Sequence, residues 1–324
     1  MKLRVGSLLF LVLVAVPCAM RGAAGDLIGN VPLPVTGTGV SVAVDCLGNV
    51  YYTLDASNNL YKMNKAGTLL GTTPIMTAAG GPILIDEFAW DETRHVLWGQ
   101  QHNTSPINIY QIDPVTGIAT FKFAAGSSIG SFRDGIAYDG TDDTLWISGD
   151  VSTFIDHVKA SDGSPATPAQ ITPKNLAGGT LGAISGVIVG QGDLLYLGQN
   201  GRQQIVTVKK SDGSFLGVFV SPGGARDEGL ECDPVNFSPK LALWSREFNP
   251  PGFISVIELA PGTCSCGGVV TTPSPAVTVT NTPTVVPPTA TPVVVVPTLS
   301  SHGFALFFVL LAGLGILLIA LRWK

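Results

Sequence analysis

A short pattern of alternating apolar residues occurs five times between residues 27 and 266, and it constrains the fold more than any other feature of the chain. Each copy holds an apolar strand, an Asp or Gly, a turn, and a second strand rich in Leu, Trp or Tyr. The copies are GVSVAVDCLGNVYYTL, DEFAWDETRHVLWGQ, DGIAYDGTDDTLWISG, SGVIVGQGDLLYLGQ and EGLECDPVNFSPKLALWS. The Asp or Gly marker falls at Asp45, Asp91, Asp139, Gly190 and Asp233, so the intervals are 46, 48, 51 and 43 residues.

Each unit continues with more strands of the same kind. A third apolar strand follows in every copy, and in four copies a turn such as SDG leads into a fourth strand. Four short strands in a unit of about 45 residues are typical of one blade of a β-propeller. A β-sandwich, the alternative all-β fold, does not explain the regular unit. The sequence therefore predicts an all-β, five-bladed β-propeller, with inter-blade packing by Trp90, Trp98, Trp146 and Trp244.

The fifth unit stops after FISVIELAPG and lacks a fourth strand. Before the first unit stands LIGNVPLPV, which matches the LLGTTPIMT that precedes the second unit. Residues 27–35 are therefore expected to supply the outer strand of the last blade. This arrangement closes the ring and removes a free strand edge. In repeat style, though not in any specific motif, the units resemble NHL-type and SMP-30-like propellers, many of which have six blades.

The N-terminus has the pattern of a secretory signal peptide over residues 1–25. Lys2 and Arg4 precede an apolar run from Leu8 to Val16, and small residues then lead to a cleavage site near Asp26. The propeller is predicted to occupy residues 26–266. Export makes disulfides feasible among Cys46, Cys232, Cys264 and Cys266, and four cysteines allow three pairings.

The C-terminal part divides into two segments. Residues 267–295 are rich in Thr, Pro and Val and carry no charge, which predicts an extended stalk. Phe304 to Leu321 is free of charge and long enough to span about 27 Å as a transmembrane helix. Arg322 and Lys324 follow it and predict a cytoplasmic C-terminus.

Residues 296–324 begin with VPTLSSHG and resemble the IPTL-CTERM tail, a relative of the PEP-CTERM class of bacterial sorting signals. Val296 stands where that family has Ile, and His302 where it usually has Trp. The resemblance implies processing by an exosortase-like enzyme at the membrane. A permanent membrane anchor is the alternative. The matching residues are Pro297, Thr298, Leu299, Ser300 and Gly303.

The charge of the predicted propeller argues against a nucleic-acid partner. All 23 acidic residues and 13 of the 18 basic ones lie between residues 26 and 266, which gives a net charge of −10. Phosphate binding needs a basic face, so a cation or a neutral ligand fits this domain better.

Acidic residues recur five positions before the marker in three units, at Asp86, Asp134 and Glu228. Equivalent places in a propeller form a ring around its axis, so the three carboxylates are predicted to share one mouth of the channel as a metal site. Their mutual repulsion would be relieved by a cation such as calcium. The alternatives are loop acids that cap turns or that pair with the neighbouring Arg133 and Arg226, or acid–base catalysis of the kind used by five-bladed glycosidases.

Two functions follow from these features. The first is a surface-displayed, non-catalytic propeller of a Gram-negative-type bacterium, which binds a glycan or surface-matrix ligand as a scaffold. The second is an exported hydrolase, a glycosidase or an SMP-30-like lactonase, that uses the carboxylates of the channel mouth. The histidines are scattered, and His102 in the loop QQHNTSP is interpreted as structural or exposed.

Overall fold

The computed structural model describes residues 24–125, 135–149, 152–222, 224, 226–249 and 252–266. The predicted signal peptide, stalk and sorting tail lie outside these residues, as does Asp134. Within the described part of the chain, no helix has the length and apolar character needed to cross a membrane. All named elements there are β-strands.

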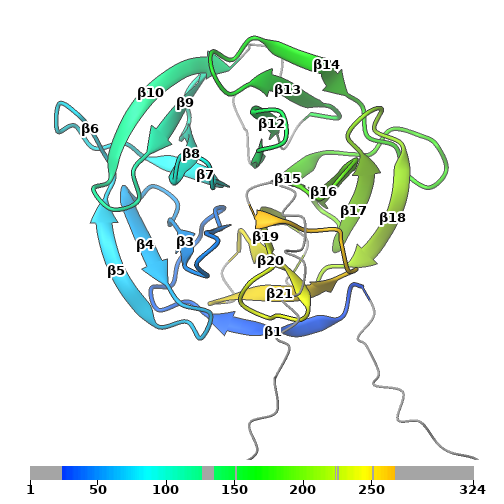
Figure 1. Ribbon diagram of the computed structural model, residues 1–324, viewed down its shortest axis with the longest axis horizontal. Coiled ribbons are helices and arrows are strands. Elements are labelled where there is room, and N and C mark those ends of the chain that lie inside the picture. Colours follow the sequence, from blue (N-terminus) through cyan, green and yellow to red (C-terminus); the bar gives the residue numbers. More distant parts are fainter. Residues whose placement is uncertain are drawn as a thin grey trace, which may run out of the picture. The chain divides into compact units, whose positions relative to one another are not determined.

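The strands form five sheets arranged as blades around a common axis (Figure 1). Blade one contains β2 (Ala43–Val44), β3 (Val50–Tyr52), β4 (Asn59–Met63) and β5 (Leu69–Pro74). Blade two contains β7 (Ile85–Asp91), β8 (Val96–Gln101), β9 (Ile107–Ile112) and β10 (Ile118–Ala125), and the short β6 (Met76–Thr77) pairs with β10. Blade three contains β11 (Gly135–Asp139), β12 (Thr144–Ser148), β13 (Ile155–Lys159) and β14 (Pro165–Ile171).

Blade four contains β15 (Ile184–Val189), β16 (Leu194–Gln199), β17 (Gln204–Lys209) and β18 (Phe215–Val220). Blade five contains β19 (Asp227–Asp233), β20 (Leu241–Glu247) and β21 (Phe253–Leu259), and its outer strand is β1 (Leu27–Pro32). In β1, Val31 lies opposite Ile254 of β21. The predicted five-bladed propeller, closed by an N-terminal strand, is thus confirmed.

The Asp markers of the repeat build turns. Asp45 Oδ1 accepts hydrogen bonds from the backbone N–H groups of Leu47 and Asn49, at 2.9 and 2.8 Å. In blade five, the carboxylate of Asp233 accepts a hydrogen bond of 2.7 Å from the indole N–H of Trp244. The repeated Asp therefore fixes the turn after the inner strand in the blades that carry it, and in blades two and five it also orients a buried Trp.

Gly190 replaces the Asp marker in blade four for a steric reason. A Cβ at Gly190 would lie 2.9 Å from the backbone oxygen of Thr263, because the C-terminal end of the propeller packs there. The backbone N–H of Gln191 donates to the same oxygen at 3.0 Å. Blade four therefore uses the C-terminal segment, in place of an Asp side chain, to support this turn.

The inner strands approach one another closely around the axis. A Cβ at Gly186 would lie 2.6 Å from the backbone oxygen of Glu228, and a Cβ at Gly229 would lie 2.5 Å from that of Val40. Farther out, the tryptophans fill the seams between blades as predicted. Trp244 of blade five, for example, packs in one hydrophobic cluster with Val42 of blade one.

Candidate functional site

Three side chains with metal-ligating or acid–base chemistry meet at the seam between blades one and two. His102 Nδ1 lies 2.6 Å from Asp86 Oδ1 and 3.9 Å from Asp55 Oδ1. One ligand atom from each residue falls within 4.8 Å of the other two. The side chains of His102, Asp86 and Asp55 are 22%, 18% and 36% exposed, so solvent and small solutes reach the group.

The strand ends place these residues. Asp86 is the second residue of β7, beside a register shift in the pairing with β8. His102 follows β8, and its backbone N–H donates to the oxygen of Leu84 at 3.0 Å. Asp55 follows β3, and its backbone N–H donates to Thr38 at 2.9 Å. Irregularities of this kind in a strand often turn side chains toward a functional site.

A side-chain contact joins the two blades beneath the group. The hydroxyl of Thr53, in blade one, donates to the backbone oxygen of Ile85, in blade two, at 3.2 Å. Ile85 precedes Asp86, and Thr53 lies two residues before Asp55. The hydrogen bond therefore holds the segments that carry the two carboxylates in a fixed relation.

The electrostatics of the group are set mainly by burial. Burial raises the pKa of Asp86 to about 6, His102 opposes this shift, and the negative charge of Asp55 adds to it. His102 Nε2 contacts the side-chain amide of Asn103, which can donate a hydrogen bond. With Nε2 as the acceptor, Nδ1 carries the proton and donates to Asp86.

The second cluster of ligand-type residues differs in chemistry. Cys46, Glu92 and Cys266 also lie close together, but the two cysteines form a disulfide and supply no thiolates. Of the two clusters found among the described residues, the Asp55–Asp86–His102 group is therefore the one in which all three side chains can act as metal ligands.

Glu228, the blade-five member of the predicted carboxylate set, lies in a cationic environment. Its carboxylate forms an ion pair with Arg226, and the Arg226 guanidinium stacks 4.3 Å from the ring centroid of Phe248. This pairing agrees with the alternative interpretation in which Glu228 pairs with the neighbouring Arg226. Asp134 lies outside the described residues, so the predicted set of Asp86, Asp134 and Glu228 stays a prediction.

Arg246 is a buried cation that the sequence reasoning missed. Its guanidinium donates to the backbone oxygens of Ser41 and Thr53 at 2.8 and 2.5 Å. Burial lowers its pKa to about 10, while the charges of Glu87 and Glu228 act in the opposite direction. Glu87 of blade two and Glu228 of blade five therefore share Arg246 as a positive neighbour, and its charge compensates part of their negative charge.

Asp227, next to Glu228, is a fully buried carboxyl group. Its Oδ1 accepts hydrogen bonds from the hydroxyls of Ser221 and Ser245, at 2.6 and 2.5 Å. Burial raises its pKa to about 7. Because Asp227 is enclosed, its role is structural, and Asp86 is the acid with a raised pKa that solutes can reach.

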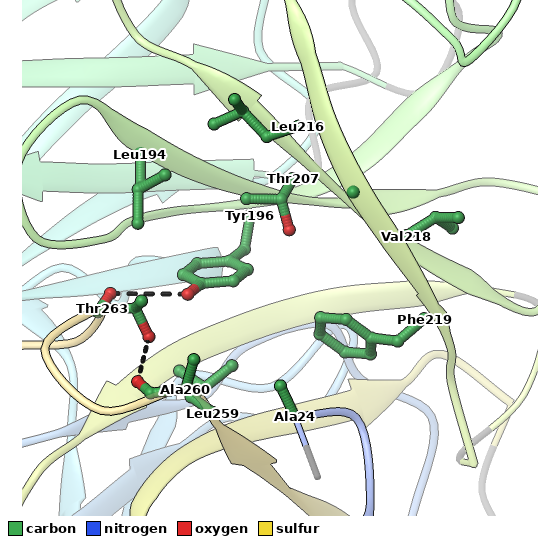
Figure 2. Close-up of a pocket in the computed structure, with 11 residues that line it drawn as sticks. Ala24, Leu194, Tyr196, Thr207, Leu216, Val218, Phe219, Leu259, Ala260 and Thr263 are labelled. Atoms are coloured by element: carbon green, nitrogen blue, oxygen red, sulfur yellow. Dashed lines mark hydrogen bonds between the residues drawn. The ribbon is translucent and has the colours of Figure 1, made fainter.

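An apolar pocket of about 280 Å³ lies between blades four and five (Figure 2). Tyr196 and Phe219 form its walls, and the Tyr196 hydroxyl donates to the backbone oxygen of Thr263 at 3.5 Å. The residues that line it carry no charged side chain within the described chain. A pocket without converging polar groups offers little for catalysis. The Asp55–Asp86–His102 group is therefore the stronger candidate for a catalytic site.

Sequence reasoning identified Asp86 but assigned His102 to a structural or exposed role and did not select Asp55. The structure places His102 in direct contact with Asp86, a pairing that the sequence did not predict. A usable signal was present in the sequence. In the first two repeats, a polar residue with metal-ligand chemistry follows the second strand, as Asp55 in the first and His102 in the second.

The fold and this site define a five-bladed β-propeller with an open polar group at one inter-blade seam. The chain is similar in structure to glutaminyl cyclase of Myxococcus xanthus, with a TM-score of 0.52 and 10% identity over 74% of this chain and 97% of that one. It is also similar to a gluconolactonase of Xanthomonas campestris, with a TM-score of 0.43 and 15% identity over 68% of this chain and 71% of that one.

A third similar structure is the calcium-binding protein regucalcin of Agrobacterium tumefaciens, with a TM-score of 0.46 and 14% identity over 72% of this chain and 95% of that one. At these identities the similarity concerns the fold alone. No protein-family model matches the sequence, and no curated protein matches it.

Proposed function

We propose that the protein is a metal-dependent propeller hydrolase whose ion is held by Asp55, Asp86 and His102. The observation that carries this proposal is the placement of one imidazole and two carboxylates from neighbouring blades within 4.8 Å. Two adjacent carboxylates repel each other, and a divalent cation would remove the repulsion that now adds to the raised pKa of Asp86. Three protein ligands leave coordination positions for water and substrate.

The donor set favours a particular kind of ion. Calcium prefers an all-oxygen shell, whereas an imidazole nitrogen suits zinc and related transition ions. Zinc or manganese is therefore a better match to His102 than the calcium expected from carboxylates alone. Such an ion would supply an activated water and polarise a substrate oxygen.

The chain's own residues determine which substrates reach the site. The domain carries a net charge of −10, so a neutral, oxygen-rich molecule approaches more easily than an anion. A lactone or a glycoside is of this kind. In the metal-free protein Asp86 and His102 are partly exposed and hydrogen-bonded to each other, and binding of an ion would release the proton between them.

Metal titration of the chelator-treated protein tests the proposal. Isothermal titration with zinc, manganese and calcium should give one binding site, tightest for zinc or manganese, together with hydrolysis of a lactone, ester or chromogenic glycoside panel. Asp86→Asn and His102→Gln should each weaken binding at least tenfold. The control is Asp162→Asn, an exposed turn residue of blade three, which should bind normally.

Two results would decide against this function. Equal binding by the parent and by His102→Gln would mean that the ion does not use the imidazole. Binding without turnover of any substrate in the panel would leave a metal-binding module in place of a hydrolase.

A second candidate function rests on the tail from 296 to 324. We propose on this basis that the protein is exported, processed by an exosortase-like enzyme and displayed at the cell surface, where a glycan or matrix component would be its partner. Mass spectrometry of the surface fraction of the native host would test the sorting. Recovery of peptides spanning Phe304 to Arg322 would favour a permanent membrane anchor instead.

A further inference from the structure

Two thiols remain beside the Cys46–Cys266 disulfide, and both are buried in the same part of the core. Cys232 belongs to the inner strand β19, and Cys264 follows β21. Both are buried in one hydrophobic cluster, at 3% and 4% exposure, and Cys264 Sγ lies 3.8 Å from the backbone oxygen of Ala242, the neighbour of the Leu243 that pairs with Cys232.

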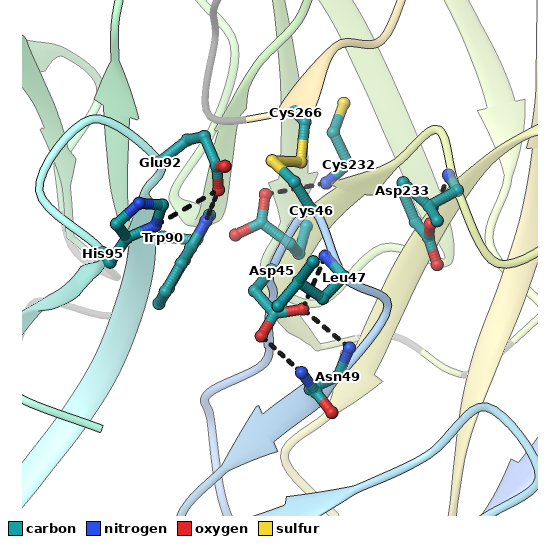
Figure 3. Close-up of a disulfide and its surroundings, with 12 residues drawn as sticks. Asp45, Cys46, Leu47, Asn49, Trp90, Glu92, His95, Cys232, Asp233 and Cys266 are labelled. Carbon is teal, nitrogen blue, oxygen red and sulfur yellow. Dashed lines mark hydrogen bonds and ion pairs between the residues drawn. A yellow bond between two sulfur atoms is a disulfide. The ribbon is translucent and has the colours of Figure 1, made fainter. Parts of the chain in front are cut away.

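The surroundings of this pair give neither thiol a strong alternative partner. Cys232 Sγ is 3.7 Å from the backbone oxygen of Val189, and Cys264 Sγ is 3.8 Å from that of Ala242, which are both weak contacts. Figure 3 shows Cys232 near the Cys46–Cys266 bond. Cys264 and that bond also border one cavity of about 510 Å³.

We propose that Cys232 and Cys264 form a second disulfide when the chain folds in an oxidising compartment. Of the three pairings that four cysteines allow, the observed Cys46–Cys266 bond leaves this one, and the burial of both thiols in one cluster beside the paired strands of blade five makes it sterically accessible. In the reaction the two thiols give two electrons and two protons to a disulfide oxidant such as oxidised glutathione. That oxidant is released as two thiols.

The bond must form during folding, before blade five is complete. Burial and the neighbouring charges of Glu231 and Asp233 raise the pKa of the Cys264 thiol in the folded protein. Little thiolate is then present, and the buried sulfur is shielded from an oxidant. The reduced, folded protein should therefore oxidise far more slowly than the refolding chain.

Two disulfides would clamp the C-terminal end of the propeller. Cys264 would be tied to the inner strand of blade five, and Cys266 is already tied to Cys46 of blade one. Thr263 is also held against blade four by Gln191. The segment just before Gly267 would thus be attached to three blades, and tension on the following chain would not peel β21 away.

Thiol counting tests this cross-link. The full chain should be refolded from the reduced, denatured state in a glutathione redox buffer. Denatured again without reductant, the full chain should show no free thiol at Cys232 or Cys264, and peptide mass spectrometry should recover a peptide joining them. The reduced, folded protein given the same buffer should form this bond at least tenfold more slowly.

Paired variants separate this proposal from other outcomes. Cys232→Ser should leave Cys264 as a thiol and the Cys46–Cys266 bond intact, while Cys46→Ser with Cys266→Ser should leave the Cys232–Cys264 bond intact. Two persistent thiols in the refolded parent would overturn the proposal. So would glutathione attached to either residue, or a bond from Cys264 to Cys46.

Discussion

The guanidinium of Arg246, in blade five, donates a hydrogen bond to the backbone oxygen of Ser41, in blade one, at 2.8 Å. The same group donates to Thr53, and Thr53 in turn donates to Ile85 of blade two. One buried cation is therefore linked through polar contacts to the seam that holds Asp86. The closing junction of the ring and the candidate site share this network.

Arg246→Met should be strongly destabilising. The substitution keeps much of the side-chain volume but removes the cation beside Glu87 and Glu228 and two hydrogen bonds to backbone oxygens. Breaking a buried charged network costs about 3–5 kcal/mol. Urea denaturation should show this loss in the free energy of unfolding, whereas Arg202→Met, at an exposed position, should change it little. A loss of less than about 1 kcal/mol would show that Arg246 is dispensable for closure.

The N-terminal closing strand should contribute to the stability of the whole ring. Val31 is 7% exposed, packs in the cluster that joins blades five and one, and lies opposite Ile254. Val31→Asp would bury a charge there, so the thermal midpoint should fall by several degrees. Leu27→Ser is the matched control, because Leu27 lies in the same strand but is 48% exposed. Equal midpoints for the two variants would contradict the closure role.

Much of this architecture is predictable from sequence because it is local and repeated. Alternating strands, Asp markers and turns recur in each unit, and the unmatched strand at residues 27–35 pointed to the closure. The site is less predictable because Asp55 and His102 meet only when two blades stack. Arg246 was missed because a single Arg within LALWSRE shows no periodic signal, and its partners are backbone atoms of another blade.

Asp227 should make stability depend on pH. Burial raises its pKa from 3.8 to about 7, so the folded state holds this proton more tightly than the unfolded state. The folded state is thus favoured at low pH, and this contribution is lost as pH rises from about 4 through 7. Asp227→Asn keeps an oxygen that accepts from Ser221 and Ser245, and it should be more stable than the parent at pH 8, by at most about 4 kcal/mol.

The comparison is made by urea denaturation at pH 4 and pH 8. The difference in unfolding free energy between Asp227→Asn and the parent should be larger at pH 8. A difference that is the same at both pH values would show that Asp227 titrates normally in the folded protein. Asp212→Asn, in an exposed turn of blade four, serves as the control. It should change the free energy of unfolding only slightly, and by the same amount at pH 4 and at pH 8.

The Cys46–Cys266 disulfide should stabilise the closed ring in addition to β1, because β1 closes the ring with the N-terminal end of the chain and the disulfide does so with the C-terminal end. It joins blade one to the segment after blade five and spans 220 residues of sequence, so it restricts the unfolded chain strongly. Loss of a native disulfide typically costs about 2–5 kcal/mol. Cys46→Ser with Cys266→Ser should lower the unfolding free energy by an amount in this range. A double variant as stable as the parent would mean that β1 and the network around Arg246 close the ring without covalent help.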